Sequence, residues 1–157
     1  GYQSPEIFEG VTFTVNSISQ TTGSFDSYGL NYSNGSLKIA LASDSNAKGY
    51  DNKRFASTFS LDTLDIDVGV LYQTTKKLST GISENGHVIS VKKNVFEKGS
   101  IYYQTSSSDI KLESGEQNSL GYTHKISKVS KVFVHASNLE SDTKNVDYIS
   151  VGFEYKF

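Results

Sequence analysis

The sequence VDYISVGFEYKF, residues 146–157, alternates strictly between two kinds of side chain. The first row is Ile149, Val151, Phe153, Tyr155 and Phe157, and the second is Tyr148, Ser150, Gly152, Glu154 and Lys156. A period of two is that of a β-strand, because successive side chains of a strand point to opposite faces of the sheet. The segment therefore predicts a strand with one apolar and one polar face, and it ends on an aromatic residue without a polar tail.

The same alternation recurs along the chain and predicts about ten strands. They cover residues 11–19, 28–32, 37–42, 54–61, 64–73, 87–96, 101–104, 119–126, 132–137 and 146–157. No segment has a helical period of hydrophobicity, and no run approaches the ~20 apolar residues of a membrane-spanning helix. We therefore expect the 157 residues to form one all-β domain, 1–157.

Composition excludes several classes of partner and site. A net charge of −2 argues against nucleic acid as a partner. The absence of cysteine excludes disulfide bonds and thiolate metal sites. With 10 Tyr and 9 Phe, the chain does not have the composition of a disordered segment.

Two kinds of connection alternate along the predicted meander. Short turns are expected at Asn34-Gly35, at Asp62-Thr63 and at residues 97–99 and 128–130, and Asn34-Gly35 is the strongest hairpin signal. Longer polar loops are expected at 21–26, 44–53, 76–86, 106–116 and 140–145, and residues 1–10 predict the end of a strand and a turn around Ser4-Pro5. Short turns at one end and long loops at the other are typical of transmembrane barrels.

Alternation alone allows two folds. In a soluble β-sandwich, such as a lectin-like binding module, the apolar rows would pack against each other. In a transmembrane barrel the apolar rows would face lipid and the polar rows a wet lumen. Aromatic residues near the short-turn ends favour the barrel, since a girdle lies at that level: Tyr32, Phe59, Phe96, Tyr155 and Phe157. The predicted fold is an antiparallel, up-and-down transmembrane β-barrel.

Two segments carry a resemblance to a known family. They are YQSPEIFEGVTF, residues 2–13, and LGYTHKISKVSKVFVHASNLE, residues 120–140, followed by ISVGFEYKF, residues 149–157. They resemble the Gram-negative general porins, which are sixteen-stranded trimeric barrels. The first looks like the turn after the constriction-loop region, and the second like the last three strands with the terminal Phe. The chain would then be the C-terminal part of such a barrel, without the first strands or the inward-folded third loop. We expect an incomplete barrel rather than a shortened one.

The resemblance implies a function and partners. A porin is not an enzyme and needs no cofactor; it allows passive diffusion of small hydrophilic solutes and ions across the bacterial outer membrane. Outer-membrane lipid, lipopolysaccharide and two further copies of the chain would be its partners. The barrel-assembly machinery would read the last strand, with Phe153, Tyr155 and Phe157 as its signal. An alternative is a small closed barrel that serves as an anchor or adhesin.

Parity along the strands gives the candidate pore-lining charges: Lys38, Arg54, Asp65, Asp67, Lys92 and Lys125. The alternative for each is a solvated charge without a selective role, and Glu154 and Lys156 are expected to be structural residues at the rim. The spacing of Asp65 and Asp67 could also suit Ca²⁺ or acid–base chemistry, although two wall carboxylates are the simpler interpretation. The three histidines, His87, His124 and His135, fall on different strands without ligand spacing, so no metal site is expected.

Overall fold

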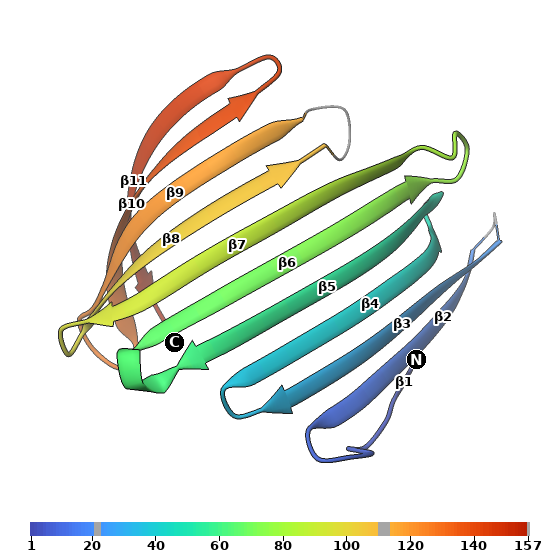
Figure 1. Cartoon of the computed structure of the whole chain (residues 1–157), viewed down its shortest axis with the longest axis horizontal. Helices are drawn as coiled ribbons and strands as arrows, with labels where there is room; N and C mark the ends of the chain where they lie inside the picture. Colours follow the sequence, from blue (N-terminus) through green and yellow to red (C-terminus); the bar gives the residue numbers. More distant parts are fainter. Residues whose placement is uncertain (21–22, 110–113, 157) are drawn as a thin grey trace.

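The chain forms one antiparallel sheet of eleven strands whose order follows the sequence (Figure 1). This computed structural model describes all residues except 21–22, 110–113 and 157. The strands are β1 (Tyr2–Gln3), β2 (Val11–Gln20), β3 (Gly23–Asn34), β4 (Leu37–Ala47), β5 (Tyr50–Leu61), β6 (Ile66–Lys77), β7 (Ser83–Val95), β8 (Gly99–Ser108), β9 (Gly115–Lys125), β10 (Ser130–Ser141) and β11 (Asn145–Tyr155). Each strand pairs with its neighbours in sequence, so β1 and β11 are the two edges of the sheet.

One 3₁₀ helix, η1 (Asp62–Leu64), joins β5 to β6. Among the described residues, no helix is long and apolar enough to cross a membrane.

The strongest predicted hairpin turn, at Asn34-Gly35, is confirmed. Asn34 pairs with Leu37, and between them Gly35 has φ +46°, a left-handed conformation that glycine adopts without steric cost. The turn predicted around Ser4-Pro5 is wrong, because the turn lies at Glu9-Gly10 and buried Ser4 continues the pairing with β2. Its backbone N–H donates to the Phe13 carbonyl at 2.8 Å, and its Oγ accepts from the Phe13 N–H at 2.9 Å.

The loops predicted at 44–53, 76–86 and 140–145 are largely strand, so these predicted loop bounds are wrong. β4 continues to Ala47 and β5 begins at Tyr50, which leaves residues 48–49 as the connection. Residues 78–82 join β6 to β7, and residues 142–144 join β10 to β11. Parts of the loops expected at 21–26 and 106–116 lie outside the described residues. The strands extend here because ladder hydrogen bonds need no apolar row, and side chains on both faces are polar at this end.

The two ends of the sheet are named here by their connections. The turn end has the connections at 35–36, 62–65, 96–98 and 126–129, and the loop end has those at 48–49, 78–82 and 142–144. The polar face is the side that carries Lys38, Thr58, Gly69 and Ser90, which lie in register across β4 to β7. The apolar face is the opposite side.

The apolar rows are not packed into a core. None of the described hydrophobic residues is buried, and Val151 and Phe153 on β11 are 79% and 61% exposed. A two-layer sandwich would bury these rows between its sheets. The sandwich interpretation is therefore wrong, and the apolar face is bare.

Small polar side chains are crowded on the other side. Thr75, Ser119 and Ser137 lie on the polar face and are only 3%, 9% and 6% exposed. The sheet is curved (Figure 1), and side chains on a concave side converge. We infer from this crowding that the polar face is the concave one.

Candidate functional site: the polar face and its apolar back

The apolar face carries a band that stops before the strands do. In most of the long strands the row is apolar from the turn end to the middle and polar toward the loop end, although Ser57, Lys93 and His124 interrupt it on β5, β7 and β9. On β6, for example, Ile66, Val68, Val70 and Tyr72 are followed by Thr74 and Lys76. The apolar band thus covers only part of the length of the strands. Such a band is expected on a surface that contacts hydrocarbon over part of its length.

Tyrosines mark the boundary of this band toward the loop end. This row of tyrosines was not predicted from the sequence. Tyr72 OH donates to Asn85 Oδ1 and Tyr103 OH to Asn118 Oδ1, each at 2.9 Å. Tyr28 on β3 occupies a similar place and is 52% exposed. The sequence signal for this boundary was a tyrosine whose next neighbour in the same row, two positions away, is polar. Together with the aromatic residues at the turn end, these tyrosines flank the band on both sides, as interfacial girdles do.

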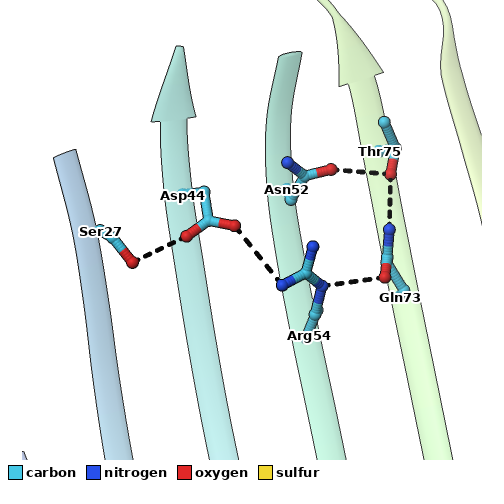
Figure 2. A network of polar contacts seen from close by, with 6 residues as sticks. All are labelled: Ser27, Asp44, Asn52, Arg54, Gln73 and Thr75. Atoms are coloured by element: carbon cyan, nitrogen blue, oxygen red, sulfur yellow. Dashed lines mark hydrogen bonds and ion pairs between the residues drawn. The ribbon is translucent and has the colours of Figure 1, made fainter. Parts of the chain in front are cut away.

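A polar network centred on Arg54 crosses four strands of the polar face (Figure 2). Arg54 Nη1 lies 3.6 Å from Asp44 Oδ2, and its Nε donates to Gln73 Oε1 at 2.9 Å. Asp44 Oδ1 in turn accepts from Ser27 Oγ at 2.8 Å. The Asp44 side chain is 14% exposed and that of Arg54 44%, so the carboxylate holds a cation that still faces water.

The same network continues toward the loop end. Gln73 Nε2 donates to Thr75 Oγ1 at 3.0 Å, and Thr75 Oγ1 donates to Asn52 Oδ1 at 2.9 Å (Figure 2). Each side chain bridges to a neighbouring strand or to the next residue of its own row. The arrangement fixes the direction of the Arg54 guanidinium.

A second charged group lies nearer the turn end. Asp67 on β6 accepts from Ser60 Oγ at 2.7 Å and pairs with Lys92 Nζ at 3.2 Å. Between this group and the Arg54 network runs a stripe of small and apolar residues in register across β4 to β7. The stripe is Ala40, Ala56, Leu71 and Val88. The polar face is therefore charged at two levels.

Asp65 does not lie on the strand where it was predicted. It caps η1 with φ +52°, and β6 begins one residue later at Ile66. The backbone carbonyl of Asp65 accepts from the Asn94 N–H at 2.9 Å. The expected carboxylate pair on one strand row is thus wrong, because the residues from Asp62 form a helical turn rather than the start of the strand.

Lys38 and Lys125 complete the predicted set and lie apart from the Arg54 network. Lys38 faces Ser33 and Thr58 across the neighbouring strands, and its exposed side chain has no partner among the described residues. Lys125 lies at the turn end of β9, opposite Lys131. The structure thus distributes the candidate charges over the polar face and gathers them into no single cluster.

Aromatic rings also cover part of the polar face, which the sequence did not reveal. The Phe133 ring lies over Gly152, where a Cβ would fall 2.2 Å from its Cζ. Tyr102 covers Gly121 in the same way. His135 stacks on Phe133 with ring centroids 6.4 Å apart and meets Tyr148 edge-on at 5.9 Å. The rings of Phe133 and Tyr102 thus fit because a glycine stands opposite each of them.

The remaining candidate residues have simpler surroundings. His87 and His124 lie on the apolar face of β7 and β9, and among the described residues no group of three or more His, Asp or Glu side chains could hold a metal ion. Phe153 and Tyr155 are 61% and 51% exposed on β11. Phe157, the third residue of the predicted assembly signal, lies outside the described residues.

Solved structures show what this arrangement is similar to. No protein-family model matches the chain, and no curated protein matches its sequence. The anion-selective porin from Comamonas acidovorans superposes with a TM-score of 0.77 at 19% identity, over 99% of this chain and 58% of that one. A loop L8 deletion mutant of OmpT, an outer membrane protein of Vibrio cholerae, gives 0.74 at 13% identity, over 98% of this chain and 61% of that one.

A third similar structure is shorter. The KdgM porin, solved in complex with disordered oligogalacturonate, superposes with a TM-score of 0.54 at 13% identity, over 99% of this chain and 89% of that one. This chain spans about three fifths of the length of the first two structures. At such identities the likeness concerns the fold alone. The fold is that of outer-membrane porin barrels.

Proposed function

We propose that the chain is part of a porin of the bacterial outer membrane, which lets small hydrophilic solutes and ions diffuse through a water-filled lumen. One observation carries the proposal: the apolar rows are bare, whereas the polar rows hold charges that bridge several strands. In water a bare apolar band of this extent is unfavourable. In a bilayer the same band is the expected outer surface, and the polar face becomes the wall of the lumen.

The edges of the sheet support closure with additional strands. In lipid, an unpaired strand edge leaves backbone N–H and C=O groups without partners, which costs several kcal/mol for each group. The sheet superposes better on the two longer barrels than on the shorter one. A barrel with more strands curves less per strand. We therefore favour closure of β1 and β11 by further strands, as in a sixteen-stranded barrel, over closure of these eleven on themselves.

The charges of the polar face would set the ionic environment of the lumen. Arg54 is held by Asp44 and Gln73, so its charge stays at one place on the wall. Fixed charges at the wall of an aqueous pore bias which ions enter it. Assembly as a homotrimer, contact with lipopolysaccharide and recognition of the β11 strand by the assembly machinery belong to the same proposal.

Conductance tests the proposal. The chain together with the strands that close its barrel, purified in detergent and added to planar bilayers, is expected to give stepwise increases in current that scale with salt concentration. Folding into the bilayer is checked in parallel by protection of the strands from protease. Folded, protected protein without conductance would contradict the porin function and favour a closed barrel that acts as an anchor or adhesin.

A further inference from the structure

A basic hollow lies at the turn end of β8 to β11. It has a volume of about 600 Å³. Its charged lining consists of Lys98, Lys125, Lys128, Lys131, Lys156 and Glu154. Three of these side chains, Lys125, Lys131 and Glu154, stand on the polar face of three adjacent strands, and the other lysines come from the turns and from the end of the chain after β11.

Two of the lysines are directly opposite each other. Lys125 on β9 pairs in register with Lys131 on β10, so their Cβ atoms are about 5 Å apart on one face. Like charges at this spacing destabilise a sheet. Lys131 has Glu154 on its other side, with Nζ and Oε2 2.9 Å apart. The side chains of Lys98, Lys125, Lys128 and Lys156 have no acceptor among the described residues, so positive charge in the hollow exceeds negative charge.

The excess of positive charge is confined to the turn end of the sheet. At the loop end of the same strands, a second hollow has an acidic lining made of Asp109, Glu116, Glu140 and Asp142. The whole chain has a net charge of −2. The lysines at the turn end are therefore not part of a generally basic surface.

We propose that this hollow binds a water-borne oxyanion of the phosphate class that carries several negative charges. Each ammonium group offers three N–H donors and a compact charge, which suit phosphate oxygens. An anion between Lys125 and Lys131 would remove the repulsion between them. The lysines on strands face away from the apolar band, so the ligand comes from the aqueous side rather than from a lipid. Binding does not depend on conduction and is independent of the proposed porin function.

Inorganic pyrophosphate is the probe for this site. It is titrated calorimetrically into the full chain in a non-ionic detergent at about 10 mM salt, where charges are weakly screened. We expect saturable binding that is about tenfold or more weaker in a K125Q/K131Q variant, because two nearby charges are lost. The K125R/K131R variant keeps both charges and should bind like the wild type. Protection of the strands from protease, measured on both variants, shows whether each has folded.

A matched control removes the same charge elsewhere. Lys53 and Lys76 are exposed at the loop end on the apolar face, and K53Q/K76Q should leave pyrophosphate binding within about twofold of wild type. Equal weakening in both double variants, or no saturable binding to the wild type, would overturn the proposal. Tighter binding of monomeric short-chain phosphatidylglycerol than of pyrophosphate would also overturn it, since the ligand would then be a lipid headgroup.

Discussion

The guanidinium Nη1 of Arg54 on β5 lies 3.6 Å from Oδ2 of Asp44 on β4, on the polar face of the sheet. The carboxylate is mostly enclosed and also accepts from Ser27, so it is held in place from a third strand. A cation held in this way keeps its position relative to the wall. This relationship makes the selectivity of the proposed lumen testable one residue at a time.

Removal of the Arg54 charge should make the channel more permeable to cations. In an Arg54→Gln variant the Asp44 carboxylate loses its counter-ion, and we expect the K⁺/Cl⁻ permeability ratio to rise about twofold, since one charge in a wide aqueous pore is partly screened. The reversal potential in a KCl gradient measures the ratio. Lys53 is the matched control because it immediately precedes Arg54 on the same strand but lies on the apolar face. An equal shift in Lys53→Gln would show that Arg54 does not line the conduction path.

Asp67 and Lys92 should be weakly coupled in stability. Their side chains are 45% and 48% exposed, so solvent screens the pair. In a double-mutant cycle with Asp67→Asn and Lys92→Gln, we expect a coupling free energy of unfolding of about 0.2–1 kcal/mol that decreases with salt. Urea unfolding in detergent measures it. A salt-independent coupling of several kcal/mol would mean that the pair is buried and does not face water.

Gly10 should tolerate substitution much less well than Gly35, although both have positive φ. A Cβ on Gly10 would lie 2.1 Å from the carbonyl oxygen of Ser33, whereas nothing lies within 4 Å of one on Gly35. Gly35→Ala should therefore lower the free energy of unfolding only by the strain of the left-handed conformation, about 1–2 kcal/mol. Gly10→Ala also displaces backbone and weakens the 2.9 Å bond from the Ser33 N–H to the Gly10 carbonyl, so we expect about 1 kcal/mol more. Similar unfolding free energies for the two variants would contradict the close approach of these backbones.

A charge on the apolar face should prevent stable insertion, and the same charge on the next residue should not. Ile89 on β7 is 43% exposed on the apolar face, and Ser90 lies on the polar face. We expect Ile89→Lys to lose about 2–4 kcal/mol of folding free energy in lipid vesicles, the cost of a lysine facing hydrocarbon. Ser90→Lys should lose about 1 kcal/mol or less, because its ammonium stays in water. The opposite order would reverse the two faces.

Much of the fold could be predicted because a strand with one apolar and one polar face alternates with a period of two in the sequence. The alternation located the ten long strands, and Asn34-Gly35 located a hairpin that the structure confirms. The strand ends beyond the band could not be found in this way. From Asp44 to Lys53, for example, the side chains on both faces are mostly polar, so no period of two remains although the ladder continues.

The site was predicted less completely, for reasons of local geometry. Parity placed Lys38, Arg54, Asp67, Lys92 and Lys125 on one face, as they lie in the structure. It failed for Asp65, because parity does not survive a helical turn such as η1. It also could not show that Asp44 holds Arg54 or that Phe133 lies over Gly152, since register between strands is not written in either strand alone. The pore-lining role of these charges stays a prediction.

The most direct measurement is the orientation of the two faces in a membrane. The chain has no cysteine, so single cysteines can be placed at adjacent positions, Thr58→Cys with Phe59→Cys on β5 and Val134→Cys with His135→Cys on β10. In a first experiment, each variant is labelled in intact membranes with a water-soluble maleimide. In a second, each variant is denatured, labelled with a fluorophore and refolded into vesicles that contain a brominated-lipid quencher. We predict that maleimide reacts at positions 58 and 135, and that the quencher acts on fluorophores at positions 59 and 134. Maleimide reaction at 59 and 134 with quenching at 58 and 135, or no difference between neighbours, would contradict an apolar face in lipid and a polar face in water.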